Sequence, residues 1–324
     1  MLVLTRHDVE RLLPMPACIA LMRDTLAARA RGKAIQPPRT ALRPDDTGTT
    51  LTMPAWVADP AALGVKVVSV FPGNHARGLD SHQGAVLSLD PATGQVLGLL
   101  EAGAVTAIRT AAVSAVATDL LATPDAGDLA LLGAGTEART HLAAMAAVRT
   151  LQRVRVWSRS AERARAFAQA AGAPGVPPIE VMPCAESAVR GASIICTLTA
   201  SPTPVLAGAW IARGAHINAV GAHTPDTREL DTDAVTSARI VVDARESALA
   251  EAGDLLIPIT EGRLRPADIH AELGEVITGA RTGRASSTEI TLFKSLGLGI
   301  EDIAVGVKVV ELARQRGLGR ELPV

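Results

Sequence analysis

The most constraining feature of this chain is a segment in which an apolar run, two glycines and a helical pattern follow directly on one another, residues 128–142 (DLALLGAGTEARTHL). The apolar run Leu129–Leu132 predicts a buried strand, and Gly133 permits the tight turn that leaves it. Gly135 would let the backbone approach a pyrophosphate, and Ala138 is small enough to seat the new helix on the sheet. Phosphates would then meet free N–H groups and the positive end of the helix dipole. The segment predicts a dinucleotide-binding turn, with an ordinary strand–turn–helix as the alternative.

The residues after the next strand-like run bear on which dinucleotide is bound. The run Arg153–Trp157 ends where such folds read the ribose, roughly 20–25 residues beyond the turn. NAD-specific folds tend to place Asp or Glu there, whereas this chain has Ser158, Arg159 and Ser160. A guanidinium offers a planar fork of donors to phosphate oxygens, so this trio suits a 2′-phosphate. We therefore expect NADP(H) to be preferred, with NAD(H) as the other candidate; the alternative is a surface arginine at the start of a solvated helix.

Length and composition exclude several classes of protein. At 324 residues the chain is too long for one compact core, which predicts two domains. A hydrophobic content of 48% and a formal net charge of −1 indicate neither disorder nor a nucleic-acid-binding surface. The three cysteines are widely spaced and form no CxxC pair, so we expect neither a disulfide framework nor a metal site. Tyr is absent, which excludes the Tyr-Lys chemistry of short-chain dehydrogenases.

The sequence also bears on where the protein is located. Its first residues lack a basic stretch followed by an apolar one, so we expect no signal peptide. We expect no membrane span either, because no apolar run was found to reach the roughly 18 residues that a span needs. The expected location is the cytoplasm.

The pattern of apolar runs predicts two regions built in different ways. After a short strand and two helices expected up to about residue 31, the β-type runs between about residues 49 and 100 read as antiparallel strands. A long Ala-rich helix is expected over 106–121. From 129 to 243 strands and helices alternate, which predicts parallel βαβ units and an α/β doubly wound sheet. The stretch 288–317 is predicted to be helical and to cross back to the first region.

Three cations stand out in the first region. Arg39 follows two prolines, Lys66 lies in the apolar run 63–70, and Arg109 lies in the apolar run 105–112. A cation in an apolar element needs a partner, because unpaired burial is costly. That partner is either a protein carboxylate or a substrate carboxylate, for which Arg is geometrically suited. A desolvated Lys66 could also act as an acid–base group.

His223 marks a second candidate site. The run 218–231 starts as a strand and breaks at its carboxyl end, a position that usually lies beside the nicotinamide in a Rossmann sheet. With an unperturbed pKa of about 6.5, His223 could donate a proton there. The alternative is a surface loop histidine. The charged residues that follow, including Glu229, are interpreted as ordinary turn and helix-start residues.

Taken together, these segments resemble the ornithine cyclodeaminase/μ-crystallin family. The matching pieces span nearly the whole chain in order: Pro38-Arg39, Met53-Pro-Ala55, Lys66, Phe71-Pro-Gly-Asn74, Ser81-His-Gln-Gly84, Asp90-Pro-Ala-Thr-Gly94, Ile108-Arg-Thr-Ala-Ala112, Gly133-Ala-Gly-Thr-Glu-Ala138, Asn218-Ala-Val-Gly-Ala-His-Thr-Pro225, and Ile290-Thr-Leu-Phe-Lys-Ser-Leu-Gly297 with Ile300-Glu-Asp302.

The resemblance implies a Rossmann domain, residues 111–287, inserted into an α+β domain, residues 1–110 and 288–324. The second domain would bind the substrate and dimerise through its strands, which makes a homodimer the expected assembly. Arg39, Lys66 and Arg109 would hold the carboxylate of a small amino or imino acid, with Lys66 and His223 catalytic; no nucleic acid or membrane partner is implied. The residues expected to border the cofactor are Gln83, Thr110, Gly133, Gly135, Thr136, Glu137, Ser158, Arg159, Thr199, Val220 and Ser295.

Three departures favour one branch of that family. The cyclodeaminases of the family carry Asp at the position of His223 and Glu at the position of Leu51. They also carry an acidic residue that binds the ribose where this chain has Ser158-Arg159. In addition, Glu137 stands where the family usually has Gln. The expected activity is NAD(P)H-dependent reduction of a small cyclic ketimine carboxylate, such as Δ1-pyrroline-2-carboxylate or Δ1-piperideine-2-carboxylate. The alternatives are ornithine cyclodeamination to proline and ammonia, alanine-type amino-acid dehydrogenation or, in another class, a crystallin-like protein that binds NADPH without turnover.

Overall fold

The computed structural model describes residues 1–45, 47–172 and 175–323. The chain forms two compact units: unit 1 comprises Met1–Thr110 and Gly297–Val324, and unit 2 comprises Ala111–Leu296. The sequence placed the return to the first domain at residue 288, which is wrong by nine residues at this end. Residues 288–296 stay in unit 2 because they carry one of its strands.

Unit 1 is built on a mostly antiparallel sheet. Its strand order is β16-β1-β7-β6-β5-β4-β2, with β3 paired to β4, and the β1–β7 pair is parallel. The strands are β1 (Leu2–Leu4), β2 (Ala34–Ile35), β3 (Thr40–Asp45), β4 (Gly48–Ala58), β5 (Ala61–Val70), β6 (His82–Leu89), β7 (Val96–Glu101) and β16 (Arg320–Glu321). The helical segments are α1 (Arg6–Leu12), α2 (Met15–Ala30), the 3-10 turn η1 (Pro72–Arg77) and α11 (Gly299–Arg316).

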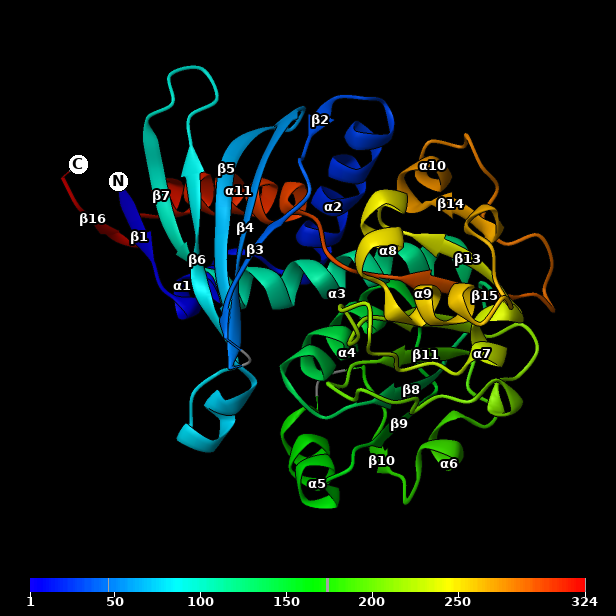
Figure 1. The fold of residues 1–324 in the computed structure, drawn as a ribbon. Helices are drawn as coiled ribbons and strands as arrows, with labels where there is room; N and C mark the ends of the chain where they lie inside the picture. The colour runs from blue at the N-terminus through cyan, green and yellow to red at the C-terminus, as the bar shows by residue number, and fades with distance from the viewer. Residues whose placement is uncertain (46, 173–174, 324) are drawn as a thin grey trace. The chain divides into compact units, whose positions relative to one another are not determined.

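The pleat of this sheet decides which side chains meet its covering helix. Helix α11 packs across β4, β5, β6 and β7 and against α2 (Figure 1). Lys66 on β5 pairs with Met53 on β4 and Val86 on β6, and all three are buried. Val67, the next residue, is exposed on the other face, as the period-2 alternation of a strand requires. The chain therefore turns Lys66 toward α11.

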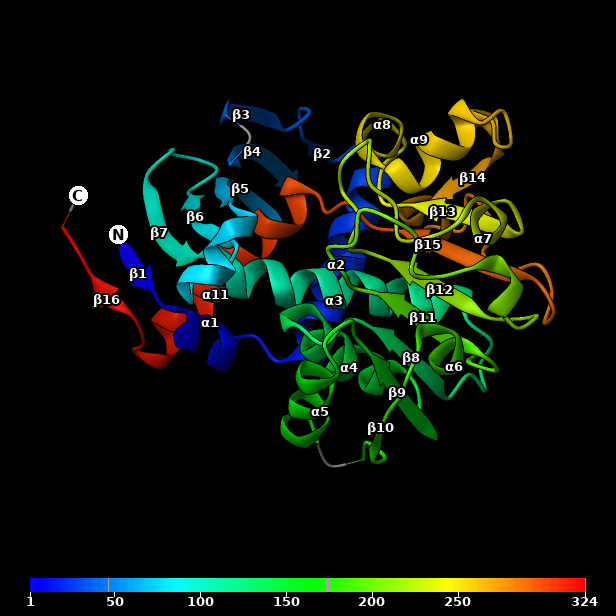
Figure 2. The same cartoon turned by 60° about the horizontal axis from the view of Figure 1, so that its bottom comes forward.

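Unit 2 is a parallel sheet covered by helices. Its order is β10-β9-β8-β11-β12-β15-β13-β14, and every pair in it is parallel (Figure 2). The strands are β8 (Asp128–Leu132), β9 (Arg153–Trp157), β10 (Ile179–Val181), β11 (Ile194–Thr197), β12 (His216–Ala219), β13 (Ala238–Val242), β14 (Ile269–Glu272) and β15 (Ile290–Lys294). The helical segments are α4 (Thr136–Val148), α5 (Ala161–Ala170), α6 (Ala185–Val189), η2 (Gly208–Trp210), α7 (Thr232–Thr236), α8 (Arg245–Glu251), α9 (Gly253–Thr260), η3 (Pro266–Asp268) and α10 (Leu273–Ile277).

The strand order of this sheet reverses direction at β8. From β8 the chain runs through β9 to β10 on one side, and β11 then pairs with the other edge of β8. Doubly wound sheets bind ligands outside the carboxyl ends of the strands at this reversal. The fold class predicted from the sequence, an α/β doubly wound sheet with a second unit, is confirmed.

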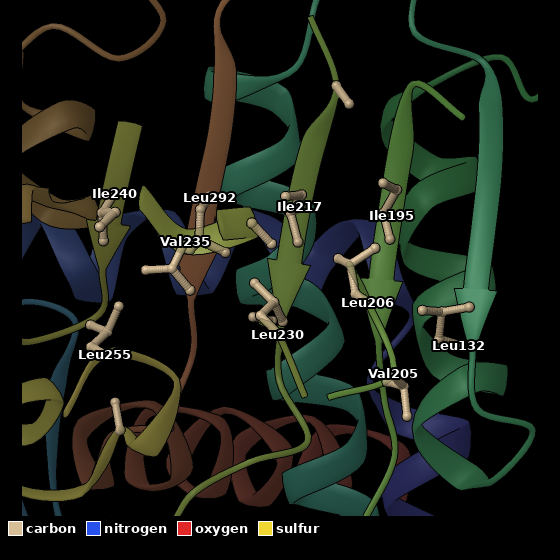
Figure 3. Packing of buried hydrophobic residues seen from close by; sticks show 14 of the residues in the cluster. Leu132, Ile195, Val205, Leu206, Ile217, Leu230, Val235, Ile240, Leu255 and Leu292 are labelled. Carbon is tan, nitrogen blue, oxygen red and sulfur yellow. The ribbon is translucent and has the colours of Figure 1, made fainter. Parts of the chain in front are cut away.

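The core of unit 2 explains why its strands read as continuous apolar runs. Ile195, Ile217 and Leu292 from neighbouring strands point to the face covered by Val235 of α7 and Leu255 of α9 (Figure 3). Alternate residues point to the opposite face, where the Asn218 amide on β12 donates to the Thr118 hydroxyl at 2.9 Å. Because both faces of these strands are buried, apolar residues do not alternate with polar ones along them.

One segment was assigned wrongly from the sequence. The stretch 288–317 was predicted to be helical with interruptions at Gly297 and Gly299, but Ile290–Lys294 is strand β15, between β12 and β13, and the helix begins only at Gly299. A short apolar run buried on both faces cannot be told from a buried helix by periodicity.

Helix α3 (Ala102–Leu121) begins in unit 1 and ends in unit 2. Contrary to the expectation from the sequence, this helix could cross a membrane by length and composition alone, but 83% of its apolar window is buried inside the protein. It therefore has the character of a core helix.

Candidate active site

Unit 1 brings together two of the three predicted cations in a buried ionic cluster. Lys66 Nζ lies 2.8 Å from Asp302 Oδ2. Arg109 donates from Nε to Asp302 Oδ1 and from Nη1 to Glu301 Oε2, each at 2.9 Å. Lys66 also donates to the hydroxyl of Thr106 at 3.3 Å. Of the two partners left open by the sequence, protein carboxylates are present, and both come from the first turn of α11.

The backbone at the start of α11 is shaped around Arg109. Gly297 has a φ of 79°, a conformation that disfavours a side chain. A Cβ built there would clash with Arg109 Nη1, so a side chain at this position would displace the guanidinium from its present place. The Leu298 N–H donates to Glu301 Oε2 at 3.2 Å, which caps the helix with the same carboxylate that binds Arg109.

The electrostatics of this cluster lower the pKa of Lys66. Burial lowers the pKa of Lys66 to about 8, against the attraction of Asp302, and the positive charges of Arg109 and Arg39 lower it further. Arg39, half-buried, therefore lies within electrostatic range of Lys66. Within the cluster, the two carboxylates Glu301 and Asp302 pair with the two cations Lys66 and Arg109.

In unit 2, the glycine turn has the form that a dinucleotide needs. Gly133 has a φ of 126°, and a Cβ there would lie 2.6 Å from the carbonyl oxygen of Leu198. Gly135 precedes α4, and a Cβ there would meet no atom of the described residues within 4 Å. Helix α4 has no side-chain cap on its first N–H groups. Gly135 and Thr136 are exposed while Ala138 is buried, so these residues fit a pyrophosphate at the helix start.

Two side chains near this turn have local partners. Glu137 is half-buried, and its carbonyl oxygen lies 2.7 Å from Nδ1 of His141, whose Nε2 lies 3.0 Å from the Ser114 hydroxyl. Burial lowers the pKa of His141 to about 4. His141 is therefore a neutral packing residue between α4 and α3.

The ribose-reading position keeps its arginine in reach of solvent. Arg159 is exposed and Ser158 is half-buried directly after β9. Ser160, the third member of the predicted trio, caps α5 by accepting a hydrogen bond from the Arg163 N–H at 3.2 Å. The Ser160 hydroxyl is therefore used by the helix, and the contact of Ser158 and Arg159 with a 2′-phosphate stays a prediction.

The residues predicted at the nicotinamide end follow the carboxyl ends of neighbouring strands. Thr199 follows β11, Val220 and His223 follow β12, and Ser295 follows β15. The backbone N–H of Val220 donates to the carbonyl oxygen of Thr197 at 3.1 Å, and the N–H of Ser295 donates to the carbonyl oxygen of Ala219 at 3.0 Å. Nδ1 of His223 lies 3.1 Å from the Gly221 carbonyl oxygen. These ends share one edge of the parallel sheet.

Two predicted cofactor contacts belong to unit 1. Thr110 is buried on α3, next to Arg109. Gln83 is exposed at the start of β6, and its amide donates to the Asp80 carbonyl oxygen at 3.1 Å. Their role toward a cofactor stays a prediction. Among the described residues no group of His, Cys, Asp and Glu side chains could hold a metal ion.

The family model that matches this chain is that of the ornithine cyclodeaminase/mu-crystallin family, over residues 1–317. The chain belongs to this family. The match confirms the resemblance inferred from the motifs, and it covers both units.

Three members of the family are close relatives. A Δ1-pyrroline-2-carboxylate reductase of Bacillus cereus is 40% identical over 324 residues, 99% of each chain. The ketimine reductase mu-crystallin of Mus musculus is 41% identical over 280 residues, 86% of this chain and 85% of its own. The structure of the Thermococcus litoralis Δ1-pyrroline-2-carboxylate reductase, solved with NADH and L-proline, superposes with a TM-score of 0.97 at 39% identity, covering 99% of this chain and 100% of that one.

The acidic residues of the buried ionic clusters were not predicted from the sequence. Glu301 and Asp302 appeared in a matching motif but were given no role, although two acidic residues directly before the apolar run 303–307 are natural partners of buried cations. Glu229 was interpreted as an ordinary turn residue, which is wrong, because it is fully buried and accepts four hydrogen bonds. Nothing in its local pattern separates it from the surface residues around it.

Proposed function

We propose that this protein reduces small cyclic ketimine carboxylates, such as Δ1-pyrroline-2-carboxylate and Δ1-piperideine-2-carboxylate, with NADPH. The observation that carries the proposal is the buried cluster of unit 1, in which a lysine with a pKa of about 8 lies among two arginines and two carboxylates. The names of the two curated relatives, both reductases of this substrate class, support it.

The cationic side chains of unit 1 would hold the substrate carboxylate. Arg39, Arg109 and Lys66 supply the positive charges, and Arg109 is itself fixed by Glu301 and Asp302. Donors fixed in this way bind a carboxylate without reorganising. Orienting the imine carbon in this manner can remove on the order of 7–11 kcal/mol from a barrier in favourable cases.

Lys66 would supply the proton that the imine nitrogen gains. Reduction of a C=N bond adds a hydride to the carbon, which NADPH supplies when bound, and a proton to the nitrogen. Because its pKa is about 8, Lys66 is mostly protonated at neutral pH and can still release a proton. Asp302 Oδ2, 2.8 Å from Nζ, stabilises the protonated form. His223 is the second candidate for this role.

We also propose a preference for NADPH over NADH. The exposed Arg159 and the neighbouring Ser158 offer donors for a 2′-phosphate. The Asp or Glu that accepts a hydrogen bond from the ribose 2′-hydroxyl in NAD-specific folds is not at this position.

A homodimer is the assembly that we propose. Ile35, Leu42 and Val67 are 65%, 66% and 41% exposed. The register places all three on one face of the sheet: Leu42 pairs with Thr50, Ile35 with Trp56, and Val67 with Thr52. This is the face opposite Lys66, and an exposed apolar face of this kind is typical of an interface. A Val67→Glu variant that remains dimeric by light scattering would argue against this face.

The proposed function is tested by one screen of the purified protein. NADPH and NADH are offered with each cyclic ketimine carboxylate, with pyruvate plus ammonia and, without reductant, with L-ornithine. We expect NADPH oxidation with the cyclic ketimines. Proline and ammonia formed from ornithine would instead establish a cyclodeaminase. Tight NADPH binding with no oxidation would establish a binding protein.

A further inference from the structure

Unit 2 contains a second buried ionic network, which the mechanism above does not use. Glu229, Asp254 and Lys294 are fully buried. Lys294 Nζ lies 3.0 Å from Asp254 Oδ2, and Asp254 Oδ1 accepts the backbone N–H groups of Glu229 at 2.8 Å and Leu230 at 3.0 Å. Burying three ionisable groups is costly unless their hydrogen bonds are well made.

The carboxylate of Glu229 joins the ends of two strands. Its Oε1 accepts the Thr199 N–H and the Thr199 hydroxyl, each at 2.6 Å. Its Oε2 accepts the Thr197 hydroxyl and the Gly221 N–H, each at 2.7 Å. Each oxygen thus receives one backbone N–H and one hydroxyl. Burial and the neighbouring Asp254 raise the pKa of Glu229, while the threonine hydrogen bonds and Lys294 oppose that shift.

The backbone is anchored on both sides of His223. Lys294 Nζ donates to the carbonyl oxygen of Ala222 at 2.5 Å. On the other side, the Gly253 N–H donates to the carbonyl oxygen of Thr224 at 3.1 Å. The segment also packs tightly on the end of β11, because a Cβ at Gly221 would clash with the carbonyl oxygen of Thr199.

We propose that Glu229, held by Asp254 and Lys294, is a positioning residue for the nicotinamide end of the cofactor. It would set Thr199 and the 220–224 segment at one fixed geometry, so that the cofactor and His223 meet a preorganised edge of the sheet. The identity of the reaction rests on the proposed function, but the positioning itself is measured by cofactor binding.

The decisive variant is Glu229→Gln, which is nearly isosteric. A glutamine has one carbonyl oxygen and one NH₂ group, so either the Thr199 N–H or the Gly221 N–H must face a donor. We expect the affinity for NADPH to fall about tenfold and kcat to fall about tenfold, since small misplacements near reacting groups cost that much or more. The affinity for 2′-phospho-ADP-ribose, which lacks the nicotinamide, should not change.

A milder pair of variants covers the case in which Glu229→Gln does not fold. Thr197→Val removes one hydroxyl from Glu229 Oε2 at a buried residue that is not among the proposed cofactor contacts. We expect about a threefold loss of NADPH affinity, and Thr197→Ser, which keeps the hydroxyl, should restore it. Glu186→Gln, on the surface of the same unit beside Arg190, is the matched control and should alter neither affinity.

The readouts separate positioning from mere stability. Titration of NADPH fluorescence gives its affinity, calorimetry gives that of the fragment, and thermal unfolding gives the melting temperature. The proposal would be overturned if the affinities for NADPH and for 2′-phospho-ADP-ribose fell equally, or if only the melting temperature fell. Equal NADPH affinities of Thr197→Val and Thr197→Ser would overturn it as well. If the unaltered protein reduces no ketimine, the proposed function fails, and the binding comparison still decides the role of Glu229.

Discussion

The two units each bury an ionic cluster, and the two clusters use the same residue types in opposite ways. In unit 1, Glu301 and Asp302 accept mainly from the side chains of Arg109 and Lys66. In unit 2, Glu229 and Asp254 accept backbone N–H groups and hydroxyls around a single lysine.

The two clusters differ in which donors their carboxylate oxygens accept hydrogen bonds from. The first cluster uses its carboxylate oxygens on the cationic side chains of Lys66 and Arg109, which the proposed function assigns to the substrate carboxylate. The second uses its carboxylate oxygens on the chain's own backbone, so it is suited to holding segments in place. Substitutions in unit 1 should therefore affect the substrate, and those in unit 2 the cofactor.

The largest effect is expected for Asp302→Leu. Lys66 and Arg109 would both lose a carboxylate while remaining buried, and breaking a buried ion pair costs about 3–5 kcal/mol of unfolding free energy. Ketimine reduction should fall more than a thousandfold. Chemical denaturation and steady-state kinetics measure the two effects, with Glu311→Gln, an exposed carboxylate on the same helix, as control. An Asp302→Leu variant of unchanged stability would show that the ion pairs contribute little.

Lys66→Met should come next and should separate the two units most cleanly. Asp302 keeps Arg109 as a partner, so the fold should survive, while kcat/KM should fall by about 10²–10⁴ through loss of the proton donor. The affinity for NADPH, measured by fluorescence, should remain the same. Lys308→Met, which removes an exposed lysine from α11, controls for the change of charge. Weaker NADPH binding in Lys66→Met would contradict the division of roles.

The pH dependence of the unaltered enzyme identifies the proton donor. Burial lowers the pKa of Lys66 from 10.5 to about 8, so the protonated form is present below pH 8 and is lost above it. We expect kcat/KM to fall above about pH 8 and this limb to be absent in Lys66→Met. A fall that persists unchanged in Lys66→Met would favour His223. Between pH 8 and 10.5, Lys66 is protonated in the unfolded chain but not in the folded one. Its contribution to the free energy of unfolding therefore rises with pH in this range, so unfolding through Lys66 cannot cause the fall in kcat/KM.

The smallest effect is expected for Arg159→Gln, in the cofactor unit. Charge-assisted hydrogen bonds contribute about 1.5–3 kcal/mol, and a partly solvated one lies at or below the lower end of that range. The KM for NADPH should rise about tenfold while those for NADH and the ketimine stay unchanged. Arg165→Gln, an exposed arginine on α5, is the matched control. An unchanged preference for NADPH would assign Arg159 to the solvated surface.

The sequence alone was sufficient for features that depend on neighbours along the chain. The Gly133–Ala138 turn, the antiparallel strands of unit 1 and the parallel alternation of unit 2 follow from local periodicity and from the conformations that glycine allows. Lys66 and Arg109 could be singled out because a charge in an apolar run is itself a local anomaly.

Only the tertiary structure decided what those charges contact. Glu301 and Asp302 lie about 190 residues from Arg109 along the chain, and local patterning carries no information about such pairings. Strand β15 and Glu229 were misread for the same reason. Whether an apolar run becomes a central strand, or a turn glutamate becomes a buried acceptor, depends on which segments the fold brings against it.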